Sequence, residues 1–259
     1  MWAPKFAFDP DARHDDGEHE DEAPRPHVTA AVMLKYALVA GALALVLFVL
    51  FPGIDLAVAR FFYVGDRQFI GHELLIVSVA RFSFNAFFYL TCAITVLGLL
   101  MALRTSGPWL GLGVSRWLFV ALCLIMGPLV VTNIGLKDHW GRARPRDIIE
   151  FSGTKAFTPP FPPSTQCDYN CSFVSGEASS IFIVMFAAAL LFRSRSRKFI
   201  CLAIIMGGLA GLVRMAQGGH FLSDVIFAGV LMAVTAATIQ LLFEILDTER
   251  LRPIEQGAA

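Results

Sequence analysis

Six long apolar runs constrain the fold of this chain more strongly than any other feature. They cover residues 31–51, 84–103, 117–136, 175–192, 199–214 and 223–244. About 20 apolar residues in a helix are enough to cross the hydrocarbon core of a bilayer. The chain is also 56% hydrophobic, with a mean hydropathy of +0.63, which is too apolar for an ordinary soluble domain. The sequence therefore predicts an all-α integral membrane protein built as a bundle of six transmembrane helices.

The segments outside these runs predict two tails and one surface helix. Residues 1–28 are rich in Asp, Glu, Pro and His and contain no apolar stretch typical of a signal peptide, so we expect a disordered acidic tail. The membrane domain is predicted over residues 29–246, and a short C-terminal tail over 247–259. Residues 54–82 mix charged and apolar side chains, which favours a short helix lying at the membrane surface.

The basic residues of the short loops predict the orientation. Arg193, Arg195, Arg197 and Lys198 lie between the fourth and fifth runs, and such clusters mark cytoplasmic loops. Counting the spans from there places both termini in the cytoplasm and the long polar loop 137–173 on the extracytoplasmic side. That loop is itself basic, against the trend, and an anionic ligand would explain why.

The composition argues against nucleic-acid binding and leaves one possible disulfide undecided. The formal net charge is zero, so nothing indicates a nucleic-acid partner. Cys167 and Cys171 lie in the long loop, where an oxidising compartment allows a disulfide; the alternative is two free thiols. The loop has too few ligands beside them for zinc, and we predict no metal and no cofactor.

Three polar stretches fall on one predicted membrane face. The first contains Lys137, Arg144 and Pro145, spaced as K-x6-R-P. The second is Ser175-Gly176-Glu177, where the fourth run begins, and the third contains Arg214, His220 and Asp224 between the fifth and sixth runs. Charged side chains beside hydrocarbon are costly and usually functional.

Together these stretches have the chemistry of a phosphate site. Lys137, Arg144 and Arg214 supply three cations for a dianion, and Arg142 is a candidate fourth. Each signal also has a plainer interpretation: basic side chains reach towards the membrane surface, and Ser before a helix is a common N-cap.

Two features of the same stretches add a nucleophile and more donors. His220 and Asp224 are four residues apart, so on a helix they share a face, and a carboxylate that orients one ring nitrogen leaves the other free to attack. Ser175 and Gly176 precede a helix, where free backbone N–H groups favour an anion.

The sequence resembles the type-2 phosphatidic acid phosphatase superfamily of membrane lipid phosphatases. That family is marked by K-x6-R-P, then P-S-G-H, then S-R-x5-H-x3-D. The first motif is complete here, and the third is complete except that Val213 replaces the serine. The second motif differs, because Val174-Ser175-Gly176-Glu177 stands in place of Pro-Ser-Gly-His. The resemblance covers about residues 54–243, including the number and order of the spans.

The resemblance implies a helical bundle and metal-independent hydrolysis through a phosphohistidine. It implies that His220 attacks phosphorus, that Asp224 orients it, and that the phosphoryl oxygens are held by Lys137, Arg144, Ser175, Gly176 and Arg214. Glu177 occupies the place of the family's leaving-group acid. A carboxylic acid can protonate the leaving group if its pKa is raised, whereas nearby cations lower that pKa. His139 is the spare candidate for that role.

We therefore expect a phosphatase in a bacterial inner membrane with its active site facing the periplasm. The expected substrate is a phosphorylated membrane lipid: a lipid A-like glycolipid, a phosphatidylglycerophosphate-like phospholipid or an isoprenyl diphosphate. One alternative is a lipid phosphotransferase that uses the same site. Another is a catalytically inactive lipid-binding or transport protein. The sequence does not specify the lipid or the oligomeric state.

Overall fold

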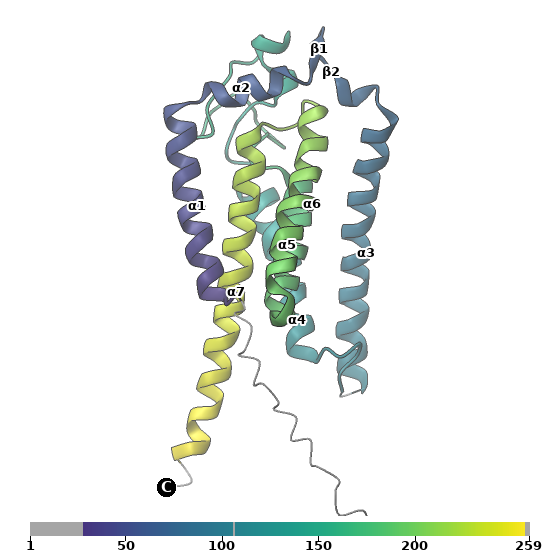
Figure 1. The fold of residues 1–259 in the computed structure, drawn as a ribbon, viewed down its shortest axis with the longest axis vertical. Coiled ribbons are helices and arrows are strands. Elements are labelled where there is room, and N and C mark those ends of the chain that lie inside the picture. Colours follow the sequence, from purple (N-terminus) through teal and green to yellow (C-terminus); the bar gives the residue numbers. More distant parts are fainter. Residues whose placement is uncertain (1–27, 106, 257–259) are drawn as a thin grey trace, which may run out of the picture.

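The computed structural model describes residues 28–105 and 107–256, and side chains as far as Asp247. The fold is mainly helical and carries one small hairpin (Figure 1). The longer elements are α1 (Ala30–Leu50), α2 (Gly53–Arg60), β1 (Tyr63–Gly65), β2 (Gln68–Phe69), α3 (Leu75–Thr105), α4 (Val114–Leu124), the π-helix η2 (Ile125–Lys137), α5 (Gly176–Leu191), α6 (Ser196–Ala216) and α7 (Leu222–Gln256). Short 3-10 turns are η1 (Ile70–His72), η3 (Pro145–Asp147), η4 (Ile149–Phe151) and η5 (Arg193–Arg195).

Five helical segments of the described chain are long and apolar enough to cross a membrane. They are Ala30–Leu50, Leu75–Thr105, Val114–Lys137, Arg193–Ala216 and Leu222–Asp247. The fourth predicted run corresponds to α5, which has only 16 residues and is about 24 Å long at 1.5 Å per residue. It packs against α6 and α7, and nine of its residues are buried. The membrane-helix class is thus confirmed, and the count of six full spans remains a prediction.

Two predicted segments differ from the structure at their boundaries. The segment 54–82 is not a single surface helix. It contains α2, the hairpin and η1, and then the beginning of α3, which starts at Leu75 rather than at residue 84. Arg81 is therefore a helical residue of α3. The third span continues beyond α4 as the π-helix η2, which contains Pro128 and ends at Lys137. Proline lacks the N–H for the helical hydrogen bond, consistent with a change of helix type around Pro128.

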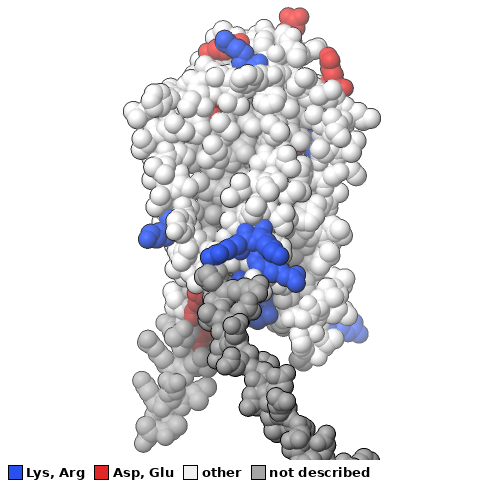
Figure 2. Space-filling view, viewed as in Figure 1, with Lys and Arg blue, Asp and Glu red and all other residues white. Residues whose placement is uncertain are grey.

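The arrangement places α5 in the middle of the bundle. Helix α1 packs along α7 (Figure 1), and α3 contacts α4, α5 and α6. The outer surface is apolar, with residues such as Leu43, Leu50 and Ile76 more than 60% exposed. Figure 2 shows a broad band almost free of charged residues, with Lys and Arg gathered towards its lower end. This surface fits a bilayer, because lipid tails are as apolar as the side chains that face them.

Part of each predicted tail lies outside the described residues. Residues 1–27 of the acidic tail lie outside the described residues. The chain enters the bundle at Val28, whose backbone N–H donates to Ser196 Oγ at 2.9 Å. At the other end, α7 continues to Gln256, so most of the predicted tail 247–259 extends that helix.

Candidate active site

Four chain segments meet at the end of the bundle that carries α2 and the hairpin. Lys137 ends η2, Ser175 caps α5, Arg214 lies in the last turn of α6, and His220 lies between α6 and α7. The backbone N–H of Ser175 donates to the carbonyl oxygen of Asp224 at 3.2 Å, which fixes the start of α5 against the start of α7.

Gly176 brings the lysine to this junction. A Cβ at position 176 would lie 2.8 Å from Lys137 Nζ, closer than real Cβ contacts. The absence of a side chain therefore lets the ammonium group lie against the N-terminus of α5. A helix N-terminus and a cation together favour an anion at this place.

His220 is held in one tautomer. It is 2% exposed, and its Nδ1 lies 2.7 Å from the carbonyl oxygen of Ser172. A carbonyl oxygen only accepts, so Nδ1 carries the hydrogen and the neutral ring has its lone pair on Nε2. Burial lowers the pKa of His220 to about 4, which keeps the ring neutral near pH 7. An oriented neutral imidazole is suited to nucleophilic attack.

Asp224 holds this arrangement from a fully buried position. Its carboxylate lies 3.7 Å from His220 Nδ1, a longer separation than the direct hydrogen bond that we expected. It accepts from Ser172 Oγ and from the backbone N–H of Phe221, the latter at 2.8 Å. Asp224 thus orients His220 largely through Ser172, a residue that the sequence patterns did not single out.

A buried ion-pair network holds Asp224 in place through Arg142. Arg142 is 1% exposed, and its Nη1 donates to Asp224 Oδ1 at 2.6 Å while its Nη2 donates to Asp55 Oδ2 at 2.8 Å. Asp55 also accepts from the backbone N–H of Ser223 at 2.9 Å. The guanidinium lies over the ring of Phe221, 4.3 Å from its centroid. The network ties α2, the long loop and α7 together.

The structure corrects the interpretation of Arg142 as a fourth phosphate ligand. Its Nη1, Nη2 and Nε all donate to protein oxygens, the last to the carbonyl of Thr158 at 2.9 Å. Asp55 was missed because its partner is 87 residues away along the chain. Its only signal in the sequence is a carboxylate in an otherwise apolar stretch.

Two buried donors of the site have no hydrogen-bond partner in the described part of the chain. They are Ser175 Oγ and Arg214 Nε. Arg214 Nη1 donates to Gln217 Oε1 at 2.5 Å, and Arg214 Nε lies 3.5 Å from a carboxylate oxygen of Glu177. Buried unpaired donors are costly, so a bound phosphoryl group that accepted from both would remove that cost.

Arg214 and Arg144 line a common pocket of about 360 Å³. The other lining residues are Gly71, His72, Ser78, Arg81, Arg146 and Gln217. Arg144 donates through Nη2 to the carbonyl and side-chain oxygens of Asn170. Burial and the neighbouring Arg146 lower the pKa of Arg144, and the carboxylates of Asp147 and Asp224 act in the opposite direction. This cationic pocket is suited to a phosphate.

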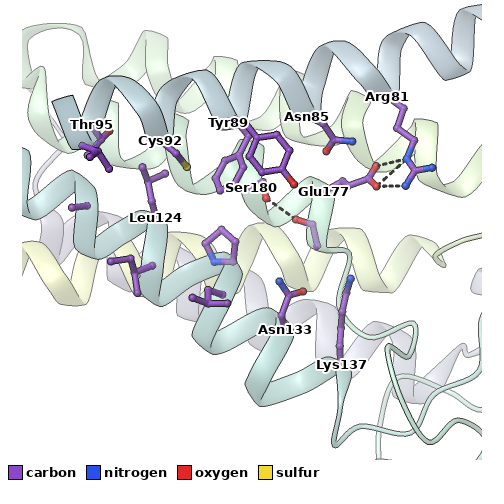
Figure 3. Close-up of a pocket in the computed structure, with 17 residues that line it drawn as sticks. Arg81, Asn85, Tyr89, Cys92, Thr95, Leu124, Asn133, Lys137, Glu177 and Ser180 are labelled. Atoms are coloured by element: carbon purple, nitrogen blue, oxygen red, sulfur yellow. Dashed lines mark hydrogen bonds and ion pairs between the residues drawn. The ribbon is translucent and has the colours of Figure 1, made fainter. Parts of the chain in front are cut away.

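Glu177 does not stand free at the start of α5. Its carboxylate accepts from Arg81 of α3, at 2.8 Å from Nη2 and 3.0 Å from Nε (Figure 3). Such a two-pronged pair is the geometry in which guanidinium binds an ionised carboxylate. Glu177 therefore joins α5 to α3 through this ion pair.

A second pocket, of about 560 Å³, descends from Glu177 into the bundle between α3, α4–η2 and α5. Figure 3 shows Arg81, Glu177 and Lys137 at one end and Cys92 and Thr95 towards the other. Most of its deeper lining is apolar, including Phe88, Leu124 and Leu129. This apolar groove is open to the helix surface and is shaped to hold hydrocarbon.

Several predicted site residues line neither of these two pockets: Ser175, His220, Asp224, His139, Cys167 and Cys171. His139 is exposed, and its Nδ1 bonds to the carbonyl oxygen of Ile134 at 2.9 Å. Cys167 and Cys171 are joined by a disulfide in the structure. Within residues 28–105 and 107–256, no group of three or more His, Cys, Asp and Glu side chains is placed to hold a metal ion.

Comparison with known proteins points to one family. The model of the PAP2 superfamily matches residues 116–246. The lipid A 4'-phosphatase of Francisella tularensis subsp. novicida is 40% identical over 199 residues, covering 74% of this chain and 87% of that protein. The lipid A 4'-phosphatase of Rhizobium leguminosarum is 30% identical over 215 residues, covering 77% and 91%. No solved structure matches significantly.

Proposed function

This chain belongs to the PAP2 superfamily, and from that premise we propose that it is a membrane lipid phosphatase that removes the 4'-phosphate of a lipid A-type glycolipid. The observation that carries the proposal is the neutral, oriented His220 together with two buried donors, Ser175 Oγ and Arg214 Nε, that have no hydrogen-bond partner among the described residues. The names of the relatives favour a lipid A substrate over the other phosphorylated lipids.

The proposed reaction has two steps at phosphorus. His220 Nε2 attacks, the bond from phosphorus to the sugar oxygen breaks, and the oxygen leaves with the electron pair and takes up a proton. Water then attacks the phosphohistidine and releases inorganic phosphate and free His220. Arg144, Arg214, Lys137 and the N-terminus of α5 stabilise the charge of the phosphoryl oxygens in both steps.

The apolar groove supports a lipid as the substrate. It begins beside Lys137 and Glu177, within reach of the cationic pocket, because Arg81 lines both. We propose that an acyl chain lies in this groove while the phosphate lies against Arg144 and Arg214. The proposed location is a bacterial inner membrane, with the active site on its periplasmic face.

The geometry disfavours an inactive lipid-binding protein. Binding a phosphate requires only the cations, whereas the bonds from His220 to Ser172 and from Ser172 to Asp224 orient a nucleophile. A lipid phosphotransferase would use the same phosphohistidine with an acceptor hydroxyl in place of water, so product analysis with added acceptor lipid separates it from a phosphatase.

The direct test is phosphate release by the purified protein from a panel of lipids. The panel contains lipid A bearing only a 4'-phosphate, lipid A bearing only a 1-phosphate, a phosphatidylglycerophosphate and an isoprenyl diphosphate. We expect the first to be the best substrate, with release lost in His220→Gln. Preference for any other member, or transfer of the phosphate to an acceptor lipid in place of release, would overturn the assignment.

A further inference from the structure

The proposed reaction needs a proton donor for the departing sugar oxygen, and the fold leaves Glu177 unsuited to that role. An alkoxide is a poor leaving group unless an acid protonates it as the bond breaks. Glu177 accepts hydrogen bonds from Arg81 and lies close to Arg214. Both of its carboxylate oxygens are thus engaged by guanidinium groups, so the donor is sought elsewhere.

The cationic pocket contains one lining residue with the right chemistry. Of the eight side chains or backbones that line it, four are arginines and the others are Gly71, His72, Ser78 and Gln217. Arginine does not release its proton in proteins, and serine and glutamine do not titrate near neutral pH. Histidine is the residue type that exchanges a proton in that range. His72 is therefore the candidate.

The fold holds His72 against the end of α6. A Cβ at the preceding Gly71 would lie 2.6 Å from the carbonyl oxygen of Ala216, so η1 packs backbone to backbone on that turn. His72 Nε2 lies 3.1 Å from the carbonyl oxygen of Gln217, whose side chain accepts from Arg214 at 2.5 Å. Because that carbonyl accepts, Nε2 carries a hydrogen, and the proton to be exchanged is on Nδ1.

We propose that His72 is the general acid that protonates the leaving oxygen. The inference rests on the proposed function and names the catalytic group that replaces the missing histidine of the second motif. As the bond from phosphorus to oxygen breaks, the electron pair goes to oxygen and His72 Nδ1 supplies its proton. Neutral His72 then takes a proton from the water that attacks the phosphohistidine, which restores the acid.

The charged residues around His72 are mainly arginines. Arg144, Arg146, Arg214 and Arg81 face it in the cationic pocket, and Arg67, Glu73 and Asp147 line the shallow pocket on its other side. A phosphate dianion bound in the cationic pocket would pair with these arginines next to His72.

The test compares substrates with good and poor leaving groups. In His72→Gln, hydrolysis of the lipid alkyl phosphate should fall by roughly 10²–10⁴-fold, the usual contribution of a positioned acid. Hydrolysis of an activated aryl phosphate should fall much less, since that group leaves as a stable anion. Imidazole added to His72→Ala should restore turnover of the alkyl phosphate and not change that of the aryl phosphate.

Two variants serve as controls. His139→Gln should leave both rates unchanged, because His139 is exposed and lines neither pocket. Glu177→Gln should lower both rates alike if Glu177 only joins α5 to α3. Equal loss for both substrates in His72→Gln, no loss in that variant, or a loss in Glu177→Gln confined to the alkyl phosphate would overturn the proposal. Absence of any phosphoenzyme on His220 in the unaltered protein would instead contradict the proposed function.

Discussion

At the residue scale, the charged residues of the site form two groups: buried residues that pair with one another, and residues that face a pocket. Asp55, Arg142 and Asp224 are at most 1% exposed and satisfy one another, so they support the nucleophile without touching substrate. Arg144 and Arg214 face a pocket, and their charge is available to a ligand. Buried charges in proteins are normally paired and hydrogen-bonded. The paired residues therefore support the site, and the residues that face the pocket are the ones that can bind a ligand.

His220 should remain neutral well below the ordinary range of histidine. Burial lowers its pKa to about 4, so the unfolded chain binds the proton first and stability falls as the pH falls from about 6.5 through 4. NMR of labelled imidazole rings, with the His220 signal assigned by its loss in His220→Gln, should show a midpoint near 4. A midpoint near 6.5 would contradict the buried, neutral nucleophile.

Removing Arg142 should be far more damaging than removing an exposed arginine. Arg142→Met leaves two buried carboxylates unpaired and should lower the free energy of unfolding by about 3–5 kcal/mol. The matched control is Arg67→Met, because Arg67 forms an exposed ion pair with Asp147. Its loss should lower the free energy of unfolding by only about 0–1 kcal/mol. Thermal unfolding in detergent gives both values. Equal shifts for the two variants would refute the supporting role of the network.

At the scale of elements, the apolar runs predicted where the helices lie, and charged residues caused errors in the predicted helix ends. Helix α1 was predicted within one residue at each end, because Lys35 is the only charged residue in it. Helix α3 begins nine residues earlier than predicted, because Arg81 was read as part of the surface segment. In the structure Arg81 is accommodated on that helix by Glu177, a partner that no pattern along the chain could reveal.

The site shows the same division between what sequence can and cannot predict. Motif spacing brought together Lys137, Gly176, Arg214, His220 and Asp224, and the structure places them at one end of the bundle. Asp55, Ser172 and His72 were not identified, since each meets its partner through contacts between residues 48 to 168 positions apart. Such partners follow from packing and not from local periodicity.

At the scale of the whole molecule, the ends of the helices predict a polarity across the membrane. The Arg193–Arg195 turn and the start of α6 lie at the end of the bundle opposite to α2 and the hairpin (Figure 1). If basic loops mark the cytoplasm, a reporter at position 195 should read cytoplasmic and one in the loop 152–168 should read periplasmic. The reverse pattern would place the site on the cytoplasmic face.

In the proposed reaction, this bundle hydrolyses a lipid phosphate through a covalent bond to His220. Rapid quenching of the purified protein with radiolabelled lipid A phosphate tests directly whether that bond forms. We expect a labelled protein whose bond is labile to acid and stable to alkali, with turnover in His220→Gln reduced by more than about 10⁴-fold. That label should be absent from His220→Gln and present in Arg67→Met. Label that persists in His220→Gln, or that survives acid, would contradict a phosphohistidine at His220.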